Sequence, residues 1–137
     1  MKNLLVVSFS FILFVSCHLS NEDKAKELIK QYIVENANDP ESYEPVEFGD
    51  LKEEDGMVFW SSEYNYLEKL LDVTSDEERK EYLLKSIDNL VEEIGEGSGY
   101  SIVHSYRGNN AYGAKILVTQ EFYLDSMLTK VLFVENF

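Results

Sequence analysis

Apolar side chains recur with a helical period between Ser20 and Pro40. They occupy every third or fourth position: Ala25, Leu28, Ile29, Tyr32 and Ile33. This spacing predicts a helix that buries one face against a core. Ser20, followed by acids in the first turn, is a favourable helix start. Pro40 ends the helix, because the residue before a proline avoids helical backbone angles.

Two more helices are predicted between Ser62 and Ile94. Their apolar faces consist of Tyr64, Leu67, Leu70 and Leu71 in the first helix, and of Leu83, Leu84, Ile87, Leu90, Val91 and Ile94 in the second. Between them, Ser75 and Glu78 have the spacing of a capping box. Three glycines after Ile94 end the second helix. We expect the pair to form a helical hairpin that covers part of a sheet.

Segments with alternating apolar positions lie before and after this pair. Residues 43–48 form a short strand, which Pro45 confines to a sheet edge. In the next strand four side chains share one side: Tyr100, Ile102, His104 and Tyr106. Residues 114–124 form a long strand, and a turn at 125–127 leads into a last strand at 128–133. Met57–Trp60 fits a strand or a helix entry equally well.

Runs of helix followed by runs of strand indicate an α+β fold. We expect the N-terminal helix to pack across an antiparallel sheet of about four strands, with a two-helix insertion after the first strand. Residues 23–137 leave no room for a second domain. They are therefore expected to form a single α+β domain.

The chain begins with Lys2 and a largely apolar run of 12 residues, Leu4–Val15, followed by Ser16 and Cys17. A membrane-spanning helix needs about 20 residues, so the run is typical of a secretory signal. Ser16-Cys17 resembles the lipobox of bacterial lipoproteins, with Phe14 where that box prefers leucine. The resemblance implies a signal peptide over 1–16, acylation of Cys17 with palmitate-like chains, an acylated tether over 17–22, and a lipid-anchored place in the cell envelope on an undetermined face. An ordinary signal peptide with an incidental cysteine and an uncleaved anchor are the alternatives.

The charge of the chain is uneven. Its formal net charge is −14; residues 22–96 contain 23 acidic and 8 basic residues, and residues 97–137 contain 3 of each. Nucleic-acid binding needs clustered lysines and arginines, so this composition excludes it. Such acidity also repels an anionic lipid surface. The acidic surface suits a cationic partner. Alternatively, it is a solvated surface that keeps the protein soluble.

Two segments, NDPESYEPVEF at 38–48 and HSYRGNNAYGAK at 104–115, resemble paired signatures of small uncharacterised envelope lipoproteins from Bacteroidota. The matching positions are Asp39, Pro40, Ser42, Tyr43, Glu44, Phe48, His104, Tyr106, Arg107, Asn110, Tyr112 and Gly113. The resemblance covers about half of the mature chain, and the helical insertion departs from the shorter members. It implies a location and a fold class, and it brings no activity.

From the same segments we derive a candidate network of ligand-binding or structural residues: Asp39, Tyr43, Glu44, His104, Tyr106, Arg107 and Asn110. Arg107 can hold a carboxylate such as Glu44 or Asp39 bidentately and so lock the corner between helix and strand. Alternatively, Arg107 binds a ligand carboxylate or phosphate beside His104 and Asn110. A change at Arg107 that impairs folding favours the first role, and one that abolishes only binding favours the second.

No arrangement of residues predicts catalysis, so we do not expect an enzyme. The two histidines, His18 and His104, have no metal-ligand spacing, and the acidic loop 50–56 lacks the pattern of a calcium loop. We expect no metal and no cofactor. Asp125-Ser126-Met127 resembles the O-glycosylation acceptor of Bacteroidota envelope proteins, which implies a glycan on Ser126; a plain turn explains the same residues.

Three functions remain. The first is a non-catalytic envelope lipoprotein that binds an unknown protein partner, favoured by its aromatic content of 13%. The second is a small-ligand-binding lipoprotein with a pocket near Arg107. The third is an acidic inhibitor or immunity-like protein that blocks a cationic enzyme.

Overall fold

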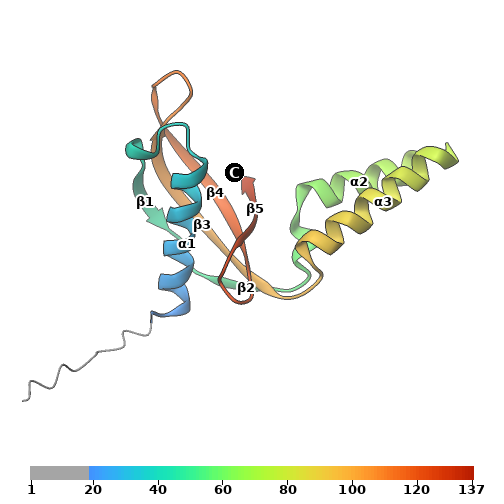
Figure 1. The fold of residues 1–137 in the computed structure, drawn as a ribbon, viewed down its shortest axis with the longest axis horizontal. Coiled ribbons are helices and arrows are strands. Elements are labelled where there is room, and N and C mark those ends of the chain that lie inside the picture. Colours follow the sequence, from blue (N-terminus) through green and yellow to red (C-terminus); the bar gives the residue numbers. More distant parts are fainter. Residues whose placement is uncertain (1–18) are drawn as a thin grey trace, which may run out of the picture.

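The computed structural model describes residues 19–137 (Figure 1). The predicted signal peptide and the first two residues of the predicted tether, Cys17 and His18, lie outside the described residues. Three α-helices and a five-stranded antiparallel sheet make up the described part of the chain, which confirms the α+β class. No helix among residues 19–137 is long and apolar enough to cross a membrane.

The first helix, α1 (Asn21–Asn36), begins as its sequence predicts. The Ser20 hydroxyl accepts a hydrogen bond from Asp23 N at 3.1 Å, and the Asp23 carboxylate accepts one from Ser20 N at 3.3 Å. These two bonds form a capping box that satisfies free amides at the helix start. The helix therefore begins at Asn21, and the last two residues of the predicted tether belong to it.

The sheet contains β1 (Glu44–Phe48), β2 (Lys52–Glu54), β3 (Gly99–Asn109), β4 (Lys115–Asp125) and β5 (Val131–Asn136). Its order is β1-β3-β4-β5, and β2 also pairs with β3. β2 lies in the segment predicted as an acidic loop. It forms because the 11-residue β3 is longer than β1, so β1 and β2 pair with successive parts of it. The two-helix insertion thus follows the second strand.

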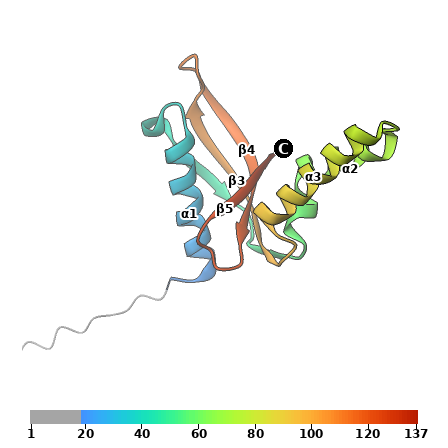
Figure 2. The same cartoon turned by 45° about the vertical axis from the view of Figure 1, so that its right-hand side comes forward.

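The core lies between α1 and one face of the sheet (Figure 2). It consists of Ala25, Ile29, Ile33, Ile102, Phe122 and Leu124. The even-numbered positions of β3 and β4 face α1, as the alternation predicts. Tyr32 meets Phe122 edge to face, with ring centroids 6.1 Å apart, an arrangement that aromatic pairs favour.

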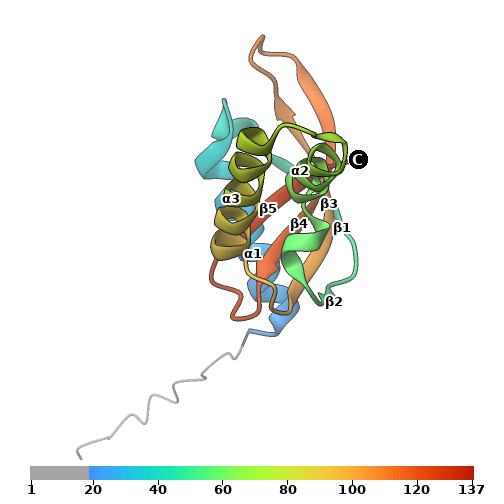
Figure 3. The same ribbon diagram turned by 90° about the vertical axis from the view of Figure 1, so that its right-hand side faces the viewer.

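The insertion forms a hairpin of α2 (Ser62–Val73) and α3 (Glu77–Ile94), entered through the short helix η2 (Met57–Trp60). The hairpin projects away from the sheet on the side opposite to α1 (Figures 1 and 3). The expectation that it covers the sheet is wrong. Trp60 and Phe133 instead stack on Tyr123, at centroid distances of 6.4 and 4.4 Å, and bury it on the face away from α1.

Most strand boundaries lie within one residue of their predicted positions, but the start of α3 and the position of the last strand differ for identifiable reasons. Asp76 rather than Ser75 caps α3, because its carboxylate accepts from Arg79 N at 2.8 Å. The last strand begins at Val131 rather than at 128, because the Asp125 carboxylate accepts from the backbone N–H groups of Thr129 and Lys130 and extends the turn.

Candidate functional site

The corner between α1 and β1 is braced by one internal hydrogen bond and fixed to the end of β3 by two more. The corner contains the short helix η1 (Pro40–Ser42). Ser42 Oγ donates to Asp39 O and accepts from Asn109 N, both at 2.7 Å, and Asn109 Nδ2 donates to Asp39 Oδ2 at 2.7 Å. The predicted corner network therefore exists, but Asn109 holds the carboxylate in place of Arg107. No spacing in the sequence distinguishes Asn109 from an ordinary turn residue.

Arg107 lies on the face of the sheet away from α1. The register places it opposite Glu44 in β1, yet the Glu44 carboxylate makes its ion pair with Lys115 of β4. The hydrogen bond and charge of Lys115 lower the pKa of Glu44, and the charge of Arg107 adds to this. No salt bridge of Arg107 is found within residues 19–137. Its predicted bidentate contact is wrong because Lys115 reaches Glu44 across the same face.

His104 is fully buried, as an interior histidine with hydrogen bonds is expected to be. Its Nδ1 lies 2.7 Å from Glu47 O and its Nε2 lies 2.9 Å from Tyr43 Oη. A carbonyl oxygen only accepts, so Nδ1 donates and Nε2 accepts from the phenol. Burial lowers the pKa of His104 and raises that of Tyr43 to about 12. Both ring nitrogens are engaged, which leaves none for a substrate proton.

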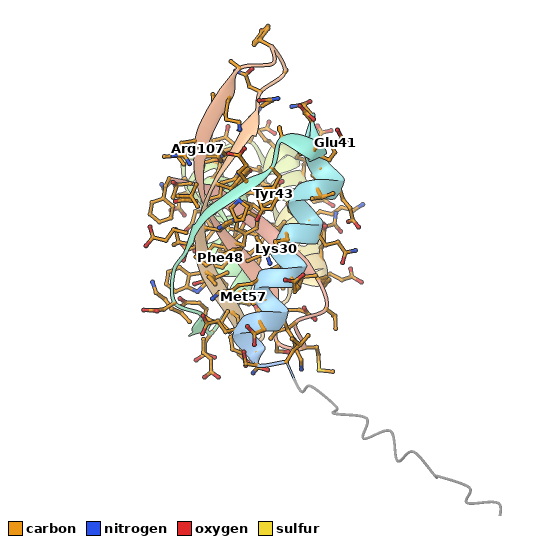
Figure 4. All side chains as sticks on the ribbon, turned by 90° about the vertical axis from the view of Figure 1, so that its left-hand side faces the viewer. Lys30, Glu41, Tyr43, Phe48, Met57 and Arg107 are labelled. Atoms are coloured by element: carbon orange, nitrogen blue, oxygen red, sulfur yellow. The ribbon has the colours of Figure 1, made fainter. Side chains whose placement is uncertain are left out.

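A cleft of about 270 Å³ lies between the end of α1 and the ends of β3 and β4. The predicted residues that line it are Asp39, Tyr43, Tyr106 and Asn110. Glu44, His104 and Arg107 do not line it. Figure 4 shows Tyr43 beside α1 and Arg107 farther out across the sheet. The structure thus brings four of the seven predicted residues together, in a pocket that does not include Arg107.

A second concave surface, which we call the hairpin groove, runs between α2 and α3. Its apolar part consists of Leu67, Leu70, Tyr82 and Leu83, and its polar end of Asp76, Glu78 and Arg79; its volume is about 730 Å³. Tyr82 is 70% exposed and Leu83 is buried. The sequence predicted the apolar faces of both helices but did not identify the groove, because the way α2 packs against α3 decides which parts of those faces stay uncovered.

Ser126 is exposed in the turn after β4 and lies beside Met127, which is 76% exposed. A modifying enzyme can therefore reach its hydroxyl.

Within residues 19–137, no group of three or more histidine, aspartate or glutamate side chains is arranged to hold a metal ion. Comparison with protein-family models, with curated proteins and with solved structures finds no match to this chain.

Proposed function

We propose that the protein is a non-catalytic lipoprotein of the bacterial cell envelope that binds a cationic protein partner through the hairpin groove. The sequence pattern around Cys17 supports the lipid anchor. The projecting hairpin, with its partly apolar groove, is the observation that carries the binding function. Only residues of the hairpin line the groove, and none of them belongs to the α1–sheet core, so a partner can occupy it without unfolding that core.

The charge of the hairpin supports a basic partner. Residues 62–94 contain 10 acidic and 4 basic side chains. An amphipathic helix commonly binds an apolar groove through residues at i, i+3, i+4 and i+7. A helix with lysines and arginines beside such a stripe matches both the apolar part of the groove and its acidic surroundings. A second copy of this chain fits less well, because two acidic hairpins repel each other.

Site-specific photo-crosslinking in the native bacterium tests this proposal. We expect a photoreactive amino acid in place of Tyr82 to form an adduct with a basic protein. The matched control is Tyr112, an aromatic residue that is 95% exposed at the far end of the sheet, where we expect no such adduct. Adducts of the same kind from both positions, or an adduct with a second copy of the chain, would contradict the proposed surface.

The anchor is tested separately by mass spectrometry of the protein purified from membranes. We expect a chain that begins at an acylated Cys17. A retained signal segment or an unmodified thiol would contradict the anchor while leaving the hairpin proposal intact.

The acidity of the hairpin also supports a narrower function, inhibition of a cationic enzyme. If the crosslinked partner is an enzyme, the purified pair should lose activity on association and regain it at high salt, which screens exposed charges. Unchanged enzyme activity in the complex would favour a binding role without inhibition.

A further inference from the structure

The cleft at the end of α1 is a separate candidate binding site, independent of the hairpin. Its lining includes apolar and aromatic side chains, among them Ile33, Tyr43, Tyr106 and Val118, and four asparagines: Asn36, Asn38, Asn109 and Asn110. Its volume of about 270 Å³ is near the lower end of small-molecule pockets. The cleft therefore accommodates a small ligand or the terminal unit of a larger one.

The charges of the cleft argue against an anion. Asp39 is the one ionisable acid among its lining residues, and no lysine or arginine lines it. The carboxyl end of α1 also lies at the cleft, where the helix dipole places partial negative charge. A phosphate or carboxylate would meet repulsion here and no fixed cation.

The hydrogen bonds already present determine what the cleft can offer a ligand. Tyr106 Oη donates to Gln120 Oε1 at 2.9 Å, and Tyr43 Oη donates to His104. Both phenol oxygens can then only accept from a ligand. Asn110 Oδ1 accepts from the backbone N–H groups of Tyr112 and Ala114. The Asn110 Nδ2 group therefore remains for a ligand, to which it can donate a hydrogen bond.

Acceptor oxygens and amide donors beside two aromatic rings match a ligand rich in hydroxyl groups. Each hydroxyl donates one hydrogen bond and accepts others, so neighbouring hydroxyls use both kinds of partner at once. An ammonium group only donates, so it could use the acceptors of the cleft, including Asp39, but not its amide donors. The amides of Asn36 and Asn109 already donate to Tyr32 O and to Asp39. We propose that this cleft binds a neutral sugar unit, oriented by the amides of Asn38 and Asn110 and by the rings of Tyr43 and Tyr106.

Titration of ¹⁵N-labelled protein with methyl glycosides of glucose, galactose, mannose and N-acetylglucosamine tests the proposal. We expect at least one glycoside to cause saturable shifts of the amide signals of residues 36–43 and 106–111. Tyr106→Phe and Asn38→Ala should each weaken that binding about fivefold, the effect of losing one hydrogen bond. Asn89→Ala, an exposed amide change on α3, should leave it unchanged.

Two results would overturn the proposal. One is the absence of saturable shifts with all four glycosides, in a protein whose spectrum shows that it is folded. The other is saturation of the same signals by inorganic phosphate or by methylammonium in place of the glycosides. Neither result bears on the hairpin groove, which lies on the opposite side of the sheet.

Discussion

Phe48 lies flat against His104, with ring centroids 3.7 Å apart and ring planes 7° apart. The stack joins β1 to β3 and covers one side of the buried imidazole. The other side faces Tyr106, whose ring centroid is 5.4 Å away. Enclosed by aromatic rings and bonded at both nitrogens, the imidazole is stable in its neutral form. A proton added to Nε2 would displace the hydrogen bond from Tyr43.

This environment makes the stability of the protein depend on pH. Burial lowers the folded-state pKa of His104 below its ordinary value of 6.5, so the unfolded chain binds the extra proton more readily. The stabilisation is complete above about pH 6.5 and is lost as the pH falls from there through the folded-state pKa. Urea unfolding of the wild-type protein between about pH 8 and pH 5.5 should show a decreasing free energy of unfolding.

The matched variant is His104→Gln, which does not titrate in this range. It should be less stable than the wild type at pH 8 but should show a flatter dependence on pH. The other histidine, His18, is present in both proteins and cancels in the comparison. Equal pH slopes for the two proteins would assign the dependence to other groups.

The corner between α1 and β1 should depend on Ser42 and not on Arg107. Ser42→Ala removes the acceptor of Asn109 N and should lower the free energy of unfolding by about 1–2 kcal/mol. Arg107→Ala removes an exposed side chain without a salt bridge and should change it by less than about 0.5 kcal/mol. Chemical denaturation of both variants measures the two values. A larger loss at Arg107 than at Ser42 would contradict the observed network.

Gly99 should tolerate no side chain, although its backbone conformation does not require glycine. A Cβ atom there would lie 2.4 Å from Leu124 O and 2.9 Å from Met57 Sδ. Gly99→Ala should therefore cost about 1–3 kcal/mol by overpacking. Gly97→Ala is the control, because a Cβ atom at Gly97 meets nothing within 4 Å. Thermal unfolding compares the variants, and equal midpoints would show that the strand shifts to accommodate the methyl group.

Glu135 should hold the hairpin in its orientation. Its carboxylate accepts from Ser62 N at 2.7 Å and from Ser62 Oγ at 2.6 Å, so β5 caps the start of α2. Glu135→Ala should cost about 0.5–2 kcal/mol, the range for loss of a helix cap. It should also accelerate amide hydrogen exchange in the first turn of α2. Glu92→Ala on the exposed surface of α3 should leave exchange in that turn unchanged.

The sequence predicts the elements of this fold better than their arrangement. The stripe from Ala25 to Ile33 and the alternation from Tyr100 to Tyr106 each reflect a local period, so the buried faces of α1 and β3 were predicted correctly. β2 was missed because Lys52–Glu54 carries no apolar alternation, and its pairing depends on the length of β3.

In the candidate site, too, local patterns were predicted correctly and contacts between elements were not. His104 was correctly placed on the apolar side of its strand, and there the structure buries it with both ring nitrogens bonded. The partner of Glu44 was not predicted, since Lys115 and Arg107 are both suitable cations and only the register of β3 and β4 decides between them. The direction of the hairpin depends on contacts of Trp60 and Glu135 with the sheet, which no local pattern contains.

The hairpin leaves and rejoins the sheet at one place. Met57 N donates to Gly97 O and Val58 N donates to Gly95 O, both at 3.1 Å. The two connecting segments are thus clamped side by side, and the β1–β3 and β2–β3 pairings do not pass through the helices. Residues 63–94 lie beyond that clamp and beyond the contacts of Trp60 and Ser62 with the sheet, so we expect them to form an exchangeable module. Evolution or a protein engineer can shorten, lengthen or replace this segment while the remaining framework keeps its register.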